Sequence, residues 1–471
     1  MKYISTRGHA GSANFEEVLL KGLAGDGGLY VPEQWPEMSH GKILELRGLD
    51  YEDLAFEVMW PFVSGAIDND AFRGHIDAAY AGFNHQSVTP LVQSGTGEWI
   101  LELHHGPTLA FKDLAMQLLG RLMDHVLAAR NARATIVCAT SGDTGGAAVD
   151  AFAGTERADL FVLLPKGRVS DVQRRMMTTN DAPNVYALEV DGNFDDCQGI
   201  VKAMFAHDSF RERVALSGVN SINWARIVAQ TVYYFAAALA LGGPDRKISF
   251  TVPTGNFGDI FAAYVAKRMG LPIDRLVIAT NVNDILARTF AAGRHEKTGV
   301  QPTSSPSMDI EVSSNFERLV FDLVDRYPVA LQRLMAGLGQ SGSFTLPATA
   351  LEGLRANFDA GSADEAQTAD MIARIHDDTG MLIDPHTAVA LHVARAQKQG
   401  DGGHGSPMVV LSTAHAAKFP DAVEAACGIR PPLPPAFGRL MQDPERMTAL
   451  PNDIAAVEAF ILDHSRVSSN T

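Results

Sequence analysis

Positive charge and cysteine are both scarce in this chain of 471 residues. Its 39 Lys and Arg residues face 55 Asp and Glu residues, which gives a formal net charge of −16 at pH 7. Nucleic-acid binding depends on basic surface that displaces counterions from phosphates, so this balance argues against nucleic acid as a partner. The three cysteines (Cys138, Cys197 and Cys427) lie far apart without CxxC spacing, and no HExxH motif occurs. We therefore expect neither a disulfide framework nor a metal site.

Long apolar runs are also missing. The longest, around 232–241, is far shorter than the roughly 20 residues that span a bilayer, and residues 1–15 lack the apolar segment of a signal peptide. The composition of 46% hydrophobic and 20% charged residues, with a mean hydropathy near zero, allows a buried core and argues against disorder. We expect a soluble, cytoplasmic protein of about three domains, at roughly 150 residues per domain.

Short β-branched runs alternate with helical patterns over much of the chain. The predicted strands are 134–140, 159–165, 184–190, 247–253, 275–281 and 407–413. Continuous apolar strands separated by helices are typical of buried parallel sheets. This alternation predicts an α/β fold, doubly wound around open sheets.

Changes in pattern along the sequence set the expected domain limits. Residues 1–95 are mostly helical with Gly-rich turns, which predicts a separate N-terminal domain. We place a smaller α/β domain at 96–215, a larger one at 216–430 and a C-terminal extension at 431–471. The segment 298–314 is rich in Ser, Pro and Thr, and predicts a long loop of the kind that covers a binding site.

The segment 104–123 combines a lysine with an apolar helix face. Leu114 and Leu118 fall at helical spacing, and Lys112 stands in the first turn. The positive end of a helix and apolar surroundings both favour a neutral amine, which is the nucleophile that Schiff-base formation needs. Taken alone, the position also fits a lysine that extends to solvent or pairs with Asp113.

Two glycine-containing loops each follow a predicted strand. TGNFGDI at 254–260 stands where backbone N–H groups and a helix dipole suit a phosphate, although it matches neither a Walker A loop nor GxGxxG. ATSGDTGGAA at 139–148 places the hydroxyls of Ser141 and Thr144 beside backbone N–H groups that suit a carboxylate or phosphate. Each loop alone also fits a tight turn or a helix cap.

The three features gain weight together, because loops at the carboxyl ends of strands meet in one crevice of an open α/β sheet. A phosphate anchor, a second anion site and a poised amine indicate a pyridoxal 5′-phosphate enzyme that acts on an amino acid.

Several strings resemble the threonine synthase family, and GPTLAFKD is among the more specific. They are HGPTLAFKD (105–113), SGDTGG (141–146), NSINWARI (220–227), PTGNFGD (253–259) and STAH (412–415), with STRG (5–8), DGGLYVP (26–32), PKGRVS (165–170) and DPHTAV (384–389). The long N-terminal domain is similar to that of the larger class of the family. The resemblance implies the fold-type II, tryptophan synthase β-like architecture: two open, twisted α/β domains, plus here a mostly helical N-terminal domain.

The resemblance also implies a cofactor site. Lys112 would hold pyridoxal 5′-phosphate as a Schiff base and act as the catalytic base and acid. The cofactor phosphate would be bound mainly by backbone N–H groups of Gly255, Asn256, Phe257, Gly258 and Asp259. Because the Asp259 carboxylate repels an anion, we expect that side chain to cap the helix or brace the loop. Thr413 would face the pyridine nitrogen, and Asp143 the 3′-oxygen of the ring.

Substrate residues follow in the same way. Ser141 and Thr144 would hold the α-carboxylate, and the substrate phosphate would go to Asn220, Ser221 and Arg226, because arginine binds phosphate bidentately. Lys166 and Arg168 are weaker candidates, since a solvated loop explains them as well. Hydrogen bonding or packing is expected for four histidines near the motifs: His104, His105, His386 and His415.

The implied reaction converts O-phospho-L-homoserine and water into L-threonine and phosphate, the last step of threonine biosynthesis. One alternative is a related lyase, either a threonine or serine dehydratase or a phospholyase; another is a catalytically silent binding protein with the same fold. Arg226 argues against a dehydratase, which needs no second anion site, and Lys112 argues against a silent protein. We expect a monomer or homodimer with no nucleic-acid or membrane partner.

Overall fold

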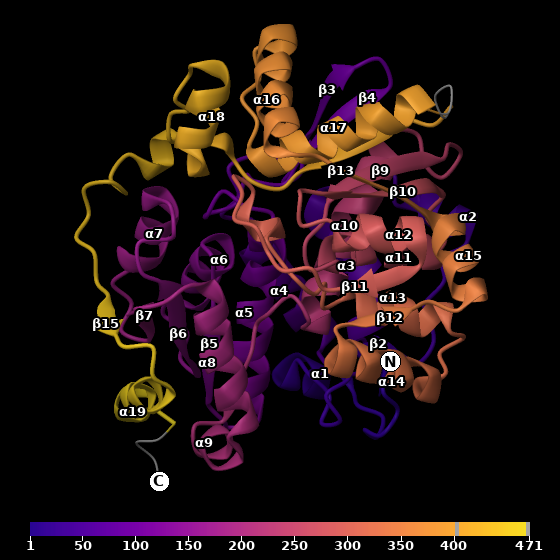
Figure 1. The fold of residues 1–471 in the computed structure, drawn as a ribbon. Coiled ribbons are helices and arrows are strands. Elements are labelled where there is room, and N and C mark those ends of the chain that lie inside the picture. The colour runs from indigo at the N-terminus through magenta and orange to yellow at the C-terminus, as the bar shows by residue number, and fades with distance from the viewer. Residues whose placement is uncertain (401–404, 468–471) are drawn as a thin grey trace.

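The computed structural model describes residues 1–400 and 405–467. They form two lobes, each built around a sheet, and an N-terminal segment whose helices contact both lobes (Figure 1). We call the lobe around the five-stranded sheet the smaller lobe and the lobe around the six-stranded sheet the larger lobe. No helix in these two ranges is long and apolar enough to cross a membrane.

The N-terminal segment is mostly helical, as predicted. It contains β1 (Tyr3–Ser5), α1 (Phe15–Lys21), β2 (Tyr30–Pro32), α2 (His40–Glu45), α3 (Tyr51–Val63) and α4 (Asn69–Tyr80), and β1 pairs antiparallel with β2. Helix α1 begins with a capping box in which Asn14 and Glu17 each accept a backbone N–H of the other. Thr6 and Arg7 bond the Glu317 carboxylate at 2.7 and 2.9 Å, so the start of the chain is tied to the larger lobe.

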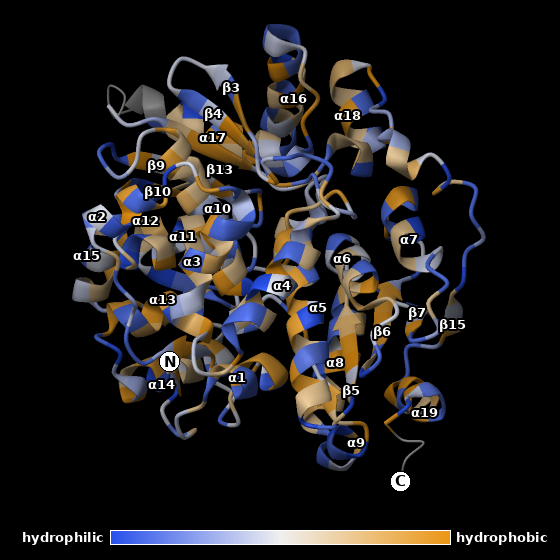
Figure 2. Cartoon of the chain, turned by 180° about the vertical axis from the view of Figure 1, so that it is seen from behind, coloured by the Kyte–Doolittle hydropathy of each residue, from blue (hydrophilic) through white to orange (hydrophobic). Residues whose placement is uncertain are grey.

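The smaller lobe has a parallel sheet in the order β15-β7-β6-β5-β8. Its elements are α5 (Lys112–Ala129), β5 (Ala134–Ala139), α6 (Asp143–Phe152), β6 (Ala158–Pro165), α7 (Asp171–Thr178), β7 (Val185–Val190), α8 (Phe194–Ala206), α9 (Asp208–Arg213), β8 (Leu216–Ser217), β15 (Thr448–Leu450) and α19 (Ile454–His464). Every residue of β6 is buried, and the hydrophobic colouring of β5 and β6 in Figure 2 fits strands covered on both faces.

The larger lobe has a sheet in the order β13-β10-β9-β14-β4-β3, parallel except for the edge strand β3. Its strands are β3 (Leu91–Gly95), β4 (Glu98–Glu102), β9 (Ile248–Pro253), β10 (Ile273–Thr280), β13 (Phe358–Ser362) and β14 (Met408–Ser412), and β11 (Arg294–Glu296) and β12 (Ser343–Thr345) form a separate pair. The strands predicted in both lobes are therefore confirmed.

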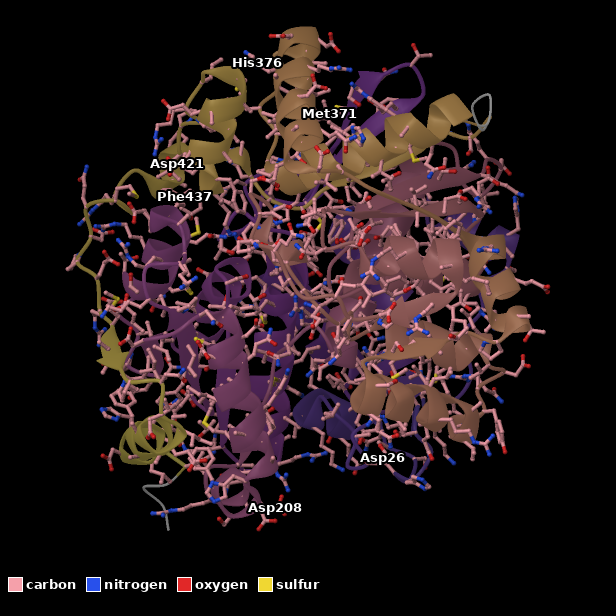
Figure 3. All side chains as sticks on the ribbon, in the orientation of Figure 1. Asp26, Asp208, Met371, His376, Asp421 and Phe437 are labelled. Atoms are coloured by element: carbon pink, nitrogen blue, oxygen red, sulfur yellow. The ribbon has the colours of Figure 1, made fainter. Side chains whose placement is uncertain are left out.

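The remaining helices lie between β8 and β15 in the sequence. They are α10 (Trp224–Ala240), α11 (Gly258–Arg268), α12 (Ile285–Ala292), η1 (Pro306–Met308), α13 (Phe316–Leu323), α14 (Pro328–Ser341), α15 (Ala348–Asn357), α16 (Glu365–Thr379), α17 (Pro385–Gly400), η2 (Ala416–Lys418), α18 (Pro420–Cys427) and η3 (Pro435–Phe437). Among them, α11, α12, α15 and α17 contact strands of the larger sheet. Helices α16 and α18 pack together at one end of the molecule, where Figure 3 labels Met371 and Asp421.

Strand pairing differs from the expected domain limits in two places. Strand β4 lies within 96–215 but pairs with β14, so it belongs to the larger lobe. Strand β15 lies within 431–471 but pairs with β7, so the C-terminal segment crosses back to the smaller lobe, along the left edge of Figure 1. Both pairings join segments far apart in sequence, which local patterns do not reveal. The domain limits themselves stay a prediction.

The order of strands creates a point in each sheet where successive connections leave in opposite directions. In the larger sheet this point lies between β9 and β14, and in the smaller sheet between β5 and β8. Ligands of open α/β sheets bind outside the carboxyl ends of strands at such points. The loops after β5, β9 and β14 are therefore the expected walls of a site.

Candidate active site

A cavity of about 460 Å³ is lined by residues that follow the carboxyl ends of β5, β9 and β14. It brings together most of the residues singled out in the sequence: Lys112, Asp143, Thr144, Asn220, Ser221, Arg226, Gly255, Asn256, Phe257, Gly258, Asp259 and Thr413. Ser141 is half-buried and does not line it. Lys166 and Arg168 are exposed and also lie outside its lining.

Lys112 is the first residue of α5, and its side chain lines the cavity. Two backbone hydrogen bonds hold the entry to α5 against the segment after β14: Phe111 N–H donates to the Thr413 carbonyl at 2.8 Å, and His415 N–H to the Leu109 carbonyl at 3.0 Å. Burial lowers the pKa of Lys112, and the charges of Lys418 and Arg226 lower it further, against the opposing effect of Asp143. The surroundings therefore favour the neutral amine expected from the sequence.

Asp143 is the first residue of α6 and is buried beside Lys112. Its Oδ2 lies 3.5 Å from Lys112 Nζ and accepts from Ser307 Oγ at 3.2 Å, while Oδ1 accepts from Gln173 Nε2 at 2.8 Å and pairs with Lys418 Nζ at 2.8 Å. Burial alone would raise the pKa of Asp143, but the charges of Lys418 and Lys112 outweigh burial and hold it well below the usual range. Asp143 is thus a carboxylate shared between two lysines.

Sequence reasoning missed Lys418, although a signal was present. The residue ends η2 and is fully buried, with Ala416 and Ala417 before it and Phe419 after it. A lysine among apolar neighbours is the same pattern that singled out Lys112. It was overlooked because the preceding STAH string was interpreted only for Thr413.

In the loop after β9, the backbone of Gly255 packs closely against the backbone of Ser307. A Cβ on Gly255 would lie 2.5 Å from the carbonyl oxygen of Ser307, so only glycine fits there. Phe257, the N-cap residue of α11, has a left-handed backbone with φ of 63°. Such strain in a residue other than glycine costs roughly 1 kcal/mol or more and persists only where packing enforces it. Here the Phe257 ring packs on Phe316 and Phe358, with centroids 5.3 and 5.9 Å away.

Asp259 does not cap α11, because no side-chain cap bond forms at this helix start. Its Oδ1 instead accepts hydrogen bonds from the hydroxyls of Tyr233 and Tyr234 on α10, the second at 2.6 Å. The expected capping role is therefore wrong, and the bracing role describes what the side chain does. Burial raises the pKa of Asp259 to about 6, against the lowering effect of the two phenols. The Oδ2 atom is buried and has no hydrogen-bond partner within the described ranges.

The raised pKa of Asp259 predicts that the free energy of unfolding depends on pH. A carboxyl whose pKa rises from 3.8 to about 6 on folding stabilises the fold fully only below pH 4, and that contribution is lost as the pH rises to 6. Ionised Asp259 then costs about 2–3 kcal/mol. We expect Asp259→Asn to raise the unfolding free energy of the cofactor-free protein at pH 8 by up to about 2 kcal/mol, with no gain at pH 3.5.

Urea unfolding at the two pH values checks this expectation. Asp208→Asn is the matched control, because Asp208 is exposed at the edge of the smaller lobe in Figure 3 and forms a surface ion pair with Arg211. An equal effect of Asp259→Asn at both pH values would contradict the argument.

Arg226 stands in the first turns of α10 with only 2% of its surface exposed. Its Nη1 donates to the Val219 carbonyl at 3.2 Å, and its Nε has no partner among the residues that the structure describes. Burial lowers the pKa of Arg226 to about 10. A buried cation with unused donors beside a cavity is suited to an anion. Asn220 and Ser221, which come just before α10, line the same cavity as Arg226.

The loop after β5 differs in detail from the expectation. Thr140, which the sequence analysis did not single out, accepts the backbone N–H groups of Gly142 and Gly145 at 2.9 Å each. Ser141 precedes Gly142, whose φ of 141° turns the chain sharply into α6. Only Thr144 of the two predicted hydroxyl residues reaches the cavity lining.

The predicted long loop lines the cavity, interrupted by η1. Ser307 N–H donates to His386 Nε2 at 3.2 Å, and His386 Nδ1 lies 2.6 Å from Asp384 Oδ2. His386 thus fastens the loop to α17. The other three histidines lie apart from this cavity, and all three line a second cavity of about 450 Å³. Nowhere in the described ranges do three or more His, Cys, Asp or Glu side chains form a group able to hold a metal ion.

Sequence models of known families match almost the whole chain. The model described as "Pyridoxal-phosphate dependent enzyme" matches residues 83–332, "Threonine synthase N terminus" matches 2–80 and "Threonine synthase, C-terminal" matches 387–461. A threonine synthase of Pseudomonas aeruginosa is 50% identical over 465 residues, which are 98% of each chain. The chain belongs to the threonine synthase family.

Solved structures agree with this membership of the threonine synthase family. The PLP-bound threonine synthase of Brucella melitensis has a TM-score of 0.96 and 55% identity, covering 99% of this chain and 100% of that one. The threonine synthase of Escherichia coli has a TM-score of 0.83 and 30% identity, covering 98% and 100%. The fold-type II architecture is thereby confirmed.

Pyridoxal 5′-phosphate is the cofactor of this threonine synthase family member, and the cavity fits it. Lys112 would supply the amine that an aldehyde requires, and the backbone of Gly255 to Asp259, at the start of α11, lines the cavity. Arg226 Nε and Gln230 Oε1 are buried at the cavity with no bond to another side chain or backbone group of the described parts. A lysine, a glycine-lined helix start and unused polar atoms are the groups that a phosphorylated aldehyde needs.

Proposed function

We propose that this enzyme converts O-phospho-L-homoserine and water into L-threonine and inorganic phosphate. One observation carries the choice of substrate. Arg226 is buried, its Nε has no hydrogen-bond partner among the described residues, and it lines the same cavity as the Gly255 loop. The loop provides for the cofactor phosphate, and Arg226, with Asn220 and Ser221, provides for a second phosphate. A lyase for an unphosphorylated hydroxyamino acid has no use for that second site.

The roles of the protein groups follow from their surroundings. Bound pyridoxal phosphate supplies an aldehyde that condenses with amines and a ring that accepts electrons from the substrate Cα. The loop from Gly255 to Asp259 would hold its phosphate, Thr413 would face the ring nitrogen, and Asp143 the 3′-oxygen. Thr144 would bind the substrate α-carboxylate. Ser141 lies outside the cavity lining, so we assign it no contact with substrate.

Lys112 is the proposed proton carrier. Burial lowers the pKa of Lys112, which favours the neutral amine that can accept a proton and later return it. We assign to Nζ the removal of the proton from Cα and then of one from Cβ, after which phosphate leaves from Cγ. Protonation at Cγ, addition of the hydroxyl of water at Cβ and return of a proton to Cα complete threonine. Arg226 would hold the phosphate before and after it departs.

Product analysis tests the proposal. Purified enzyme with pyridoxal phosphate is incubated with O-phospho-L-homoserine, and phosphate and L-threonine are measured; equal amounts of both are expected. L-Threonine and L-serine are tested as alternative substrates in separate reactions. Release of ammonia and an oxo acid as the main products would overturn the proposal in favour of a dehydratase, and no turnover of any of the three would favour a silent protein.

We further propose a cytoplasmic monomer or homodimer. Support comes from three cysteines that are all free, as in a reducing compartment. Light scattering of the purified protein distinguishes the two assemblies, and a larger mass than a dimer would contradict both.

A further inference from the structure

A second buried lysine stands behind the first. Lys418 has no exposed surface; its Nζ lies 2.8 Å from Asp143 Oδ1 and donates to the Thr108 carbonyl at 2.7 Å. It does not line the cavity, so any effect on the reaction must pass through another group. Asp143 is that group, because its other oxygen faces Lys112 Nζ at 3.5 Å.

The hydrogen bonds around Asp143 fix which oxygen faces which lysine. Oδ1 is held by Lys418 and by Gln173 Nε2 at 2.8 Å, and Oδ2 by Ser307 Oγ at 3.2 Å. The carboxylate therefore cannot turn toward Lys112 with both oxygens while Lys418 is present. Lys112 Nζ keeps one long contact, 3.5 Å, instead of a tight ion pair.

We propose that Lys418 is a positioning residue for Lys112: by neutralising and orienting Asp143, it keeps the Lys112 amine free to react. The inference rests on the proposed function, in which Lys112 is the reacting amine. Without Lys418, Asp143 would turn to its remaining cation, and a tight ion pair would hold Lys112 protonated.

The charges around Lys112 decide whether the loss of Lys418 raises or lowers the pKa of Lys112. The charged or titratable groups whose electrostatic interactions bear on Lys112 or on its partner Asp143 are Asp143 of α6, Lys418 of η2, Arg226 of α10, Asp259 of α11 and His386 of α17. Lys418 lowers the pKa of Lys112, and Asp143 raises it. Loss of the Lys418 charge alone removes a lowering effect and strengthens a raising one. Loss of both charges together removes the raising effect and the lowering effect at once.

The pH midpoint at which Lys112 becomes reactive is measured by competitive acetylation of lysines in the full-length cofactor-free protein. The extent of labelling is determined by mass spectrometry. Lys418→Gln removes the charge but keeps an amide able to reach Asp143 and Thr108. We expect it to move the labelling midpoint of Lys112 upward by about 1 pH unit. In the double variant with Asp143→Asn the midpoint should return toward that of the wild type. Lys21→Gln, which breaks an exposed ion pair with Glu17, should leave it unchanged.

Kinetics of the holoenzyme give a second readout. A shift of about one unit makes the neutral fraction of Lys112 roughly tenfold smaller below the midpoint, so Lys418→Gln should lower kcat about tenfold. Because Lys418 does not line the cavity, KM for the phosphorylated substrate should stay within about twofold.

A structural role alone predicts no shift in the Lys112 midpoint, and an unchanged midpoint in Lys418→Gln would overturn the inference. If that variant fails to fold, Lys418→Met is measured in its place: a Lys112 midpoint raised by a similar amount supports the inference, and an unchanged midpoint overturns it. Failure of the proposed function is separate, because it shows as absent phosphate release by the wild type whatever the labelling result.

Discussion

Replacing Lys112 by alanine is expected to slow phosphate release from O-phospho-L-homoserine by about 10³-fold, the scale of losing a positioned acid and base. The variant should also lose the covalent attachment of the cofactor, seen as loss of the absorption band near ~420 nm. Stability should not fall, since Asp143 keeps Lys418, Gln173 and Ser307 as partners. The effect is therefore one on chemistry, measured by steady-state rates and by the thermal midpoint together.

Lys21→Ala is the control for this substitution, because Lys21 is an exposed lysine whose ion pair with Glu17 is long, at 3.9 Å. It should leave both the rate and the absorption band unchanged. Equal rates for wild type and Lys112→Ala would remove the proposed mechanism altogether.

Replacing Arg226 by methionine should change binding and stability in opposite directions. Loss of charge-assisted hydrogen bonds to phosphate costs about 2–3 kcal/mol, or roughly 30- to 160-fold in KM. The cofactor-free protein should instead gain stability, because Arg226 is buried with a pKa lowered to about 10 and donates to one backbone carbonyl. Removing a poorly compensated buried charge commonly stabilises a fold.

Substrate titrations and urea unfolding of the Arg226→Met variant test both halves. Arg226→Lys serves as a matched control, since it keeps the charge but not the planar donor pair, and should give an intermediate KM. If the cofactor dissociates while KM for the remaining holoenzyme is unchanged, Arg226 serves the cofactor phosphate and the substrate assignment is wrong.

Local pattern was enough to find six strands, β5, β6, β7, β9, β10 and β14, and to place Lys112 and the Gly255 loop at the starts of helices. Lys112 stood out because an amine at the start of an apolar helix is costly, and the glycines of the Gly255 loop because they join a strand to a helix. Both features lie within a few residues of sequence.

What the sequence could not supply depends on segments far apart in the chain. The protonation of Asp143 does not follow from local sequence, because its counter-ion, Lys418, lies far along the chain and in a different lobe of the fold. The place of β4 is set by its pairing with β14, and the place of β15 by β7. Ser141 was assigned to substrate by its neighbourhood, but the turn at Gly142 decides which hydroxyl reaches the cavity.

The burial of Arg226 has a consequence for the way substrate binding depends on ionic strength. Arg226 is 2% exposed, whereas the charge of −16 is spread over the whole chain. Dissolved salt screens exposed charges beyond about 8–10 Å but reaches buried ones poorly. Added inert salt should therefore weaken the outer repulsion of a phosphorylated substrate more than the inner attraction. Encounter with the anion becomes faster as ionic strength rises, the reverse of an enzyme that attracts its anion with a basic surface.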